Sequence, residues 1–300
     1  MTAGLYLLTV AIWGTTWIAL KWQLGEVAPL ASIAYRFALA ALVLFVGLWL
    51  TGKLQRLRWS DQRWCMVQGL CLFCLNFLCF YTATQWIASG LVAVIFSTAS
   101  VWNALAAKVV HGRPLSSRVL LAGALGVTGL GLLLAPQWQA SSFTAQSALG
   151  VLLACVGTLC FSVGNLVSAH QQANGIRPLT SNAWGMLYGT VLLVLIGLLA
   201  QVPFTLEWTP RYLGALFYLA IPGSVIGFTA YLTLVGRLGP ERAAYCTVLF
   251  PVVALNISAW LEGYSWTLWG GLGLLLVLAG NLCMFARWPA ALRLQTKAPA

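Results

Sequence analysis

Charged side chains are scarce in this chain of 300 residues: Asp, Glu, Lys and Arg together make up 7% of it. An average soluble domain carries about 25%. Only five residues are acidic and two are histidines. A water-soluble protein needs polar groups to cover its surface. The composition therefore excludes a soluble enzyme, a disordered tail protein and a secreted disulfide scaffold.

Patterns of metal ligands are also lacking. The eight cysteines lie within or at the ends of apolar segments, where a cysteine packs as a small apolar residue. Cys71 and Cys74 have a C-x-x-C spacing, but no second pair and no histidine ligand follows. We therefore expect no metal site and no cofactor.

Apolar residues are abundant instead, at 61% of the chain. They form long unbroken runs such as Leu120–Leu134, whereas a transmembrane barrel strand alternates between inward and outward residues. A bilayer-spanning helix needs about 20 apolar residues. The sequence thus predicts an all-α integral membrane protein with ten transmembrane helices and short loops. The predicted spans are residues 3–23, 29–51, 64–86, 89–110, 116–136, 147–170, 178–201, 210–235, 241–261 and 266–288.

Basic residues predict the orientation in the membrane. Of the sixteen Lys and Arg residues, Lys21 and Arg211 fall on one face, Arg36 lies inside a span, and the remaining thirteen fall on the other face. Because basic loops stay in the cytoplasm, we expect both termini to be cytoplasmic and the protein to lie in the inner membrane. These residues stand singly beside apolar runs, so nucleic acid is not an expected partner.

An internal repeat divides the chain. The segment 29–35 matches the segment 178–184 at Pro, Leu, Ser and Ala, at an offset of 149 residues. Each half, residues 1–140 and 141–300, would hold five helices. Because five is odd, the second half enters from the opposite side of the membrane. Such an inverted repeat is typical of secondary transporters.

Three places in the sequence resemble a known family. Ile12–Trp17 reads I-W-G-T-T-W, Tyr35–Phe37 reads Y-R-F, and Pro251 is followed by Leu261 and Glu262. The chain in these respects resembles the ten-helix, EamA-type branch of the drug/metabolite transporter superfamily. The resemblance implies export of small metabolites. Within the family, the sequence as a whole is most similar to the exporters of aromatic and other amino acids. Exporters of drugs or nucleotide sugars in the same superfamily are the alternative.

The first half departs from the family pattern in two places. Ala99-Ser100 stands where the family often has proline, and Gly112-Arg113 where it often has Gly-Glu. A first-half hinge and the family's common ion pair are therefore not expected by resemblance.

Polar and aromatic residues within the spans are the candidate substrate contacts. A charge inside the membrane is costly, so Arg36 is expected either to attract a substrate carboxylate or to extend toward the interface. The amides of Asn103 and Asn165 would bind a polar substrate or join helices. Aromatic rings at mid-depth would bind apolar groups or an ammonium group, or simply pack between helices. These rings belong to Trp17, Tyr81, Trp102, Phe161, Trp184, Tyr231 and Tyr245.

The expected mechanism is alternating access around a central cavity. All five acidic residues lie near span ends or in loops, which favours a facilitator, with Glu262 as the alternative coupling group. An integral-membrane enzyme is the rival class, since His111, His170, Asp61 and Glu241 share one predicted face, but no catalytic motif joins them. A homodimer and a monomer are both compatible with the sequence.

Overall fold

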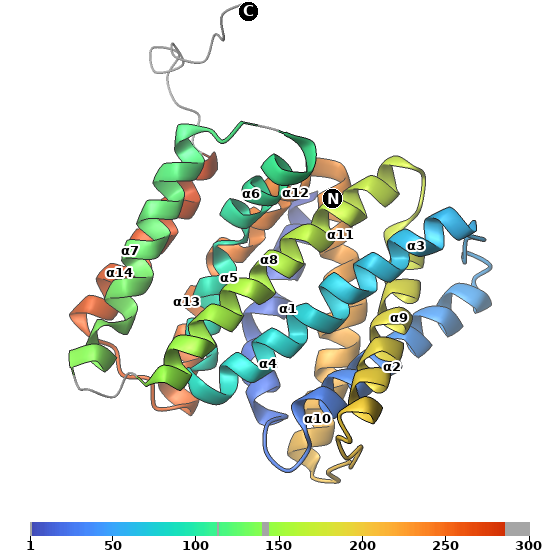
Figure 1. Ribbon diagram of the computed structural model, residues 1–300, viewed down its shortest axis with the longest axis horizontal. Coiled ribbons are helices and arrows are strands. Elements are labelled where there is room, and N and C mark those ends of the chain that lie inside the picture. The colour runs from blue at the N-terminus through green and yellow to red at the C-terminus, as the bar shows by residue number, and fades with distance from the viewer. Residues whose placement is uncertain (1, 113, 140–143, 286–300) are drawn as a thin grey trace, which may run out of the picture.

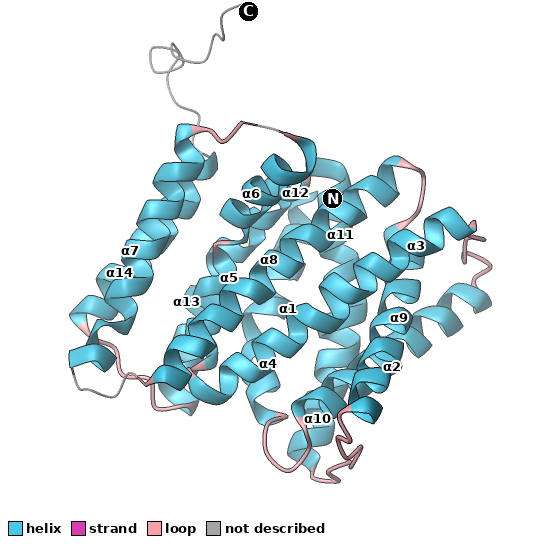
Figure 2. Cartoon of the chain, viewed as in Figure 1, coloured by secondary structure: helices cyan, strands magenta, loops and turns pink. Residues whose placement is uncertain are grey.

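The computed structural model describes residues 2–112, 114–139 and 144–285, and within these ranges the chain forms helices and loops without strands (Figures 1 and 2). In chain order the elements are α1 (Thr2–Trp22), α2 (Pro29–Leu50), α3 (Trp59–Gln68), η1 (Gly69–Leu75), α4 (Asn76–Trp86), α5 (Ser89–Ser97), α6 (Ala99–His111), α7 (Ser117–Gln139), α8 (Ala145–Ala173), α9 (Pro178–Leu199), α10 (Pro210–Tyr218), η2 (Leu219–Ile226), α11 (Gly227–Leu238), α12 (Pro240–Ala243), η3 (Ala244–Leu249), α13 (Phe250–Leu261) and α14 (Leu268–Phe285).

Among the described residues, eight helices or continuous helix runs are long and apolar enough to cross a bilayer. The pair α5 and α6 is bent by 47° and would be a ninth span if both helices cross together. Leu268–Cys283 in α14 is apolar but shorter. The prediction of an all-helical membrane protein is confirmed at this level.

Prolines and hydroxyl groups fix several helix starts. Pro29, Pro178 and Pro210 occupy the first turns of α2, α9 and α10, where the missing N–H would have no partner in the helix. The Thr144 hydroxyl accepts a hydrogen bond from the Ser147 N–H and caps α8. These local signals explain why the predicted span starts agree closely with the structure.

Two π-helical segments interrupt the long helices. They are η1, which begins at residue 69, and η2, which begins at residue 219. Pro222 lies inside η2, where it offers no N–H for an α-helical hydrogen bond. The apolar pattern predicts spans at both places but not these wider turns. Such turns are frequent at functional sites.

The helices pack so that the two halves of the chain interlock. At one edge of the bundle α7 packs along α14, and toward the other edge α2 packs on α9 (Figure 1). A Cβ on Gly129 of α7 would lie 2.6 Å from the carbonyl oxygen of Gly273 on α14, so the close approach needs glycine. In the middle, α1 packs on α11 and α13, while α8 packs on α4 and α6.

Candidate functional site

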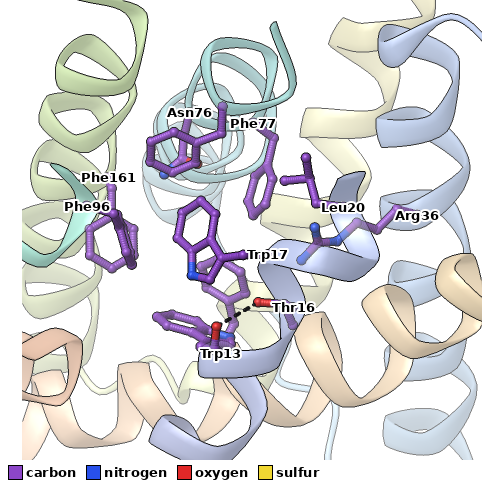
Figure 3. A pocket seen from close by; sticks show the side chains of 11 residues that line it. Trp13, Thr16, Trp17, Leu20, Arg36, Asn76, Phe77, Phe96 and Phe161 are labelled. Atoms are coloured by element: carbon purple, nitrogen blue, oxygen red, sulfur yellow. Dashed lines mark hydrogen bonds between the residues drawn. The ribbon is translucent and has the colours of Figure 1, made fainter. Parts of the chain in front are cut away.

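An aromatic cavity lies where α1, α2, α4, α5, α8 and α11 meet, with the labelled side chains gathered around Trp17 (Figure 3). Its volume is about 40 Å³, which holds only a few water molecules. The lining residues are Trp13, Thr16, Trp17, Leu20, Arg36, Asn76, Phe77, Phe80, Phe96, Phe161 and Phe228.

Helix α1 contributes four of the side chains that line this cavity. Trp13, Thr16, Trp17 and Leu20 are spaced three or four residues apart, which places them on one face of an α-helix. The Thr16 hydroxyl donates a hydrogen bond to the carbonyl oxygen of Trp13 (3.0 Å). The indole N–H of Trp13 donates to the carbonyl oxygen of Gly223 in η2 (2.9 Å).

Aromatic rings make up most of the wall. Phe96 packs against Trp17 with ring centroids 5.5 Å apart, against Phe80 at 5.4 Å and against Phe161 at 4.7 Å. The rings meet mostly edge to face or tilted, an arrangement that attracts because positive ring edges meet negative ring faces. Such a wall suits an apolar or aromatic group of a substrate.

Arg36 is the one charged residue among those that line the cavity. Its side chain is 3% exposed, so it stays inside the protein. Nε donates a hydrogen bond to Oγ of Ser224 (2.9 Å), and Cζ lies 4.3 Å from the centre of the Phe77 ring. The guanidinium also interacts with the Tyr81 hydroxyl. Because no carboxylate is present among the described residues of the lining, the guanidinium can bind an anionic group of a ligand.

Three predicted residues form a hydrogen-bonded group next to this cavity. The Nδ2 group of Asn165 donates to the Tyr231 hydroxyl (3.0 Å) and to Oδ1 of Asn103 (3.3 Å). All three side chains are fully buried. The Tyr231 ring lies 5.0 Å from Trp13 and 5.3 Å from Phe161, both of which line the cavity. We call Asn103, Asn165 and Tyr231 the polar barrier.

A second, wider pocket adjoins the polar barrier at Asn103. It has a volume of about 480 Å³ and is lined by residues of α6, α8, α11 and α12, including Asn103, Leu166 and Glu241. Asn103 also donates a hydrogen bond to the carbonyl oxygen of Pro240 at the start of α12 (3.0 Å). We call this pocket the vestibule. The polar barrier thus contacts both spaces, since Asn103 lines the vestibule and the Tyr231 ring packs on Trp13 and Phe161 of the aromatic cavity.

The comparisons with known proteins agree with this arrangement. The model of the EamA-like transporter family matches residues 1–135 and 148–286. The chain belongs to the EamA-like transporter family. It is therefore a multi-pass membrane transporter of the drug/metabolite transporter superfamily, as its resemblance in the sequence predicted.

Several relatives of this EamA-like transporter cover most of its length. Protein PagO of Salmonella typhimurium is 23% identical over 263 residues, which are 87% of this chain and 85% of the relative. A probable amino-acid metabolite efflux pump of Escherichia coli is 22% identical and covers 92% of each chain. A solved crystal structure shares the fold with a TM-score of 0.70 at 16% identity, covering 98% of both chains.

The structure brings most of the predicted site residues together. Trp17, Arg36 and Phe161 line the aromatic cavity of this EamA-like transporter. Tyr81 adjoins it, because its hydroxyl interacts with Arg36 and donates a hydrogen bond to Oε1 of Gln23 (2.6 Å). Asn103, Asn165 and Tyr231 form the polar barrier described above.

Two predicted residues do not line this cavity, and the prediction for a third, Tyr245, is not tested. The indole N–H of Trp102 donates to the Thr98 hydroxyl (3.1 Å) on its own side of the α5–α6 bend, away from the cavity lining. Trp184 packs against Phe45 with ring centroids 5.1 Å apart and does not line the cavity. The side chain of Tyr245 lies outside the described residues.

Sequence reasoning did not select the other residues of the lining. Trp13 lies four residues before Trp17 and Leu20 three residues after it. This spacing is a signal that would have found the α1 face, because it follows the helical period. Asn76 also lines the cavity, together with Phe80, which lies four residues further along α4.

Proposed function

We propose that this EamA-like transporter is a secondary transporter that exports small metabolites, specifically aromatic and other amino acids, by alternating access. The observation that carries the proposal is the pairing of a buried Arg36 with a wall of aromatic rings in one cavity. A guanidinium attracts a carboxylate, while the rings attract an apolar or aromatic side chain. The similarity to the probable amino-acid metabolite efflux pump of Escherichia coli supports this substrate class.

The proposed architecture is ten membrane helices in two inverted five-helix repeats, residues 1–140 and 141–300, with both termini in the cytoplasm. The family model supports this by matching two separate segments of similar length. The two π-helical segments, which begin 150 residues apart at Gly69 and Leu219, support it too. The distribution of basic residues supports the orientation.

The transport path would run from the vestibule through the polar barrier into the aromatic cavity. Arg242 lines the vestibule, and the excess of basic residues on this face supports a cytoplasmic position for it. At the opposite end of the cavity, Lys21 Nζ donates a hydrogen bond to the carbonyl oxygen of Thr84 (2.6 Å) and Tyr81 bonds Gln23. Contacts thus close the cavity toward both ends. Opening one set while the other stays closed would give alternating access.

The cavity volume of about 40 Å³ is too small for an entire amino acid, so its walls must separate to admit one. The contacts between the two halves of the chain indicate how the walls could separate. Arg36 of α2 is bonded to η2, and Trp13 of α1 is also bonded to η2. A rocking motion of one repeat against the other would move these contacts together.

Reconstitution in liposomes tests the proposal. Counterflow of labelled Phe, Trp, Met and Thr is measured, with a nucleotide sugar and a cationic dye as comparison substrates. We expect counterflow with the amino acids and competition by the aromatic ones. Transport of only the nucleotide sugar or the dye would contradict the substrate class while leaving the family assignment unchanged.

A further inference from the structure

We propose that Asn76 binds the α-ammonium group of the transported amino acid. This assignment rests on the proposed function, because it names how the same cavity would recognise the second charged group of its substrate. It goes beyond the carboxylate contact at Arg36 and makes Asn76 a specificity-determining residue.

The side-chain amide of Asn76 makes no hydrogen bond with any described residue. Its Oδ1 atom is buried without a partner, and the residue is 1% exposed while lining the aromatic cavity. A buried polar group that lacks a partner destabilises the protein, because it has lost its hydrogen bonds to water. The other wall residues of α4, Phe77 and Phe80, are apolar. A hydrogen bond to a substrate would satisfy this amide.

The remaining polar groups of the cavity cannot all serve an ammonium group. Arg36 and Trp17 carry only N–H donors, and the indole N–H of Trp17 is likewise buried without a partner. Such donors suit a carboxylate. An ammonium group needs acceptors, which Asn76 Oδ1 and the Thr16 hydroxyl provide. The Thr16 hydroxyl donates its proton to the carbonyl oxygen of Trp13 and keeps lone pairs that can accept. Asn76 differs because its Oδ1 atom is buried without any partner, so it is the acceptor that gains most from a bond to the ammonium group.

Electrostatics also favours binding of the carboxylate at Arg36 and of the ammonium group at Asn76. A positive ammonium group is repelled by the Arg36 guanidinium, and the two are best placed against different walls. Arg36 enters from α2 and Asn76 from α4, on different sides of the cavity in Figure 3. The rings of Trp17 and Phe80 also line the cavity and add cation–π attraction for an ammonium group.

The test compares three competitors of labelled phenylalanine counterflow: phenylalanine itself, 3-phenylpropionate, which lacks the ammonium group, and phenethylamine, which lacks the carboxylate. In Asn76→Leu we expect phenylalanine and phenethylamine to compete about tenfold to hundredfold more weakly than in the unmodified protein. Competition by 3-phenylpropionate should change little. In Arg36→Lys we expect the opposite selectivity: phenylalanine and 3-phenylpropionate compete more weakly, whereas competition by phenethylamine does not change.

Matched variants separate recognition from folding. Asn256→Leu removes an amide that is exposed on α13 and bonded to the carbonyl oxygen of Val252, and it should leave all three competitors unchanged. Asn76→Asp keeps the side-chain volume and an acceptor, and it should favour phenethylamine. Ligand-induced thermal stabilisation in detergent repeats the comparison for any variant whose transport is too slow.

The outcomes distinguish this assignment from the proposed function. Suppose that the unmodified protein shows phenylalanine counterflow. If Asn76→Leu then weakens all three competitors equally, or weakens none of them, the role of Asn76 is overturned and the proposed function stands. A selective loss in Thr16→Val but not in Asn76→Leu would move the ammonium contact to Thr16. Absence of amino-acid counterflow in the unmodified protein would overturn the proposed function and this assignment with it.

Discussion

Arg36 Nε donates a hydrogen bond to Oγ of Ser224 (2.9 Å), which joins α2 to the π-helical segment η2 across 188 residues of sequence. The Ser224 hydroxyl in turn donates to the carbonyl oxygen of Leu219 (2.8 Å) within η2. The wider turn of η2 therefore holds the single cation of the aromatic cavity in a fixed place.

Ser224→Ala should weaken transport of carboxylate substrates by loss of this acceptor. The guanidinium would keep its charge but lose the bond that fixes its position, so we expect the half-saturating phenylalanine concentration to rise about tenfold. The maximal rate and the amount of protein in the membrane should change little. Concentration-dependent counterflow measures both quantities.

A double-mutant cycle tests whether Ser224 acts through Arg36. In an Arg36→Gln background, Ser224→Ala should add almost no further loss, because residues that share one interaction are not additive. Full additivity of the two substitutions would show that Ser224 contributes by another route.

The sequence predicted the helices well because their signals are local. Apolar runs give the spans, and residues such as Pro29 and Pro178 fix the helix starts. The cavity was predicted only in part, because depth in the membrane does not reveal which face of a helix points inward. Trp102 and Trp184 are aromatic and lie at mid-depth, yet they face other neighbours. The amide oxygen of Asn76 lacks a hydrogen-bond partner, and this can be known only from the tertiary contacts of α4.

Tyr231→Phe should open the polar barrier more often. The substitution removes the hydroxyl that accepts from Asn165 but keeps the ring that packs on Trp13. Loss of about 1 kcal/mol from the closed state raises the open population about fivefold. The readout is the labelling rate of a cysteine placed at Thr16, by an impermeant reagent from the vestibule side, with the eight native cysteines replaced.

Tyr212→Phe is the matched control for that experiment. Tyr212 is also fully buried, and its hydroxyl shares a hydrogen bond with the Ser32 hydroxyl (2.9 Å) away from the polar barrier. Its removal should leave the labelling rate unchanged. Equal rates for Tyr231→Phe and the unmodified barrier would contradict a gating role.

Gly129→Ala should destabilise the contact between α7 and α14. The added Cβ would meet the backbone oxygen of Gly273 at 2.6 Å, so the helices must move apart, at a cost of about 1–3 kcal/mol. At Gly123, on the same helix, an added Cβ would meet its nearest atom at 3.7 Å. Gly123→Ala should therefore be neutral or slightly stabilising. Thermal unfolding in detergent compares the two variants, and equal midpoints would refute the close-packing explanation.

A pH gradient should not drive accumulation of amino acids by this protein. Among the described residues, no carboxylate and no imidazole lines the aromatic cavity, so these residues offer a proton no binding group beside the substrate. Glu262, the alternative coupling group in the sequence, instead accepts a hydrogen bond from the Ser89 N–H at the start of α5 (2.9 Å). In vesicles loaded at one pH and diluted into another, labelled phenylalanine should reach equal concentrations on both sides. Sustained uphill accumulation that Glu262→Gln abolishes would contradict facilitated transport and assign the coupling to Glu262.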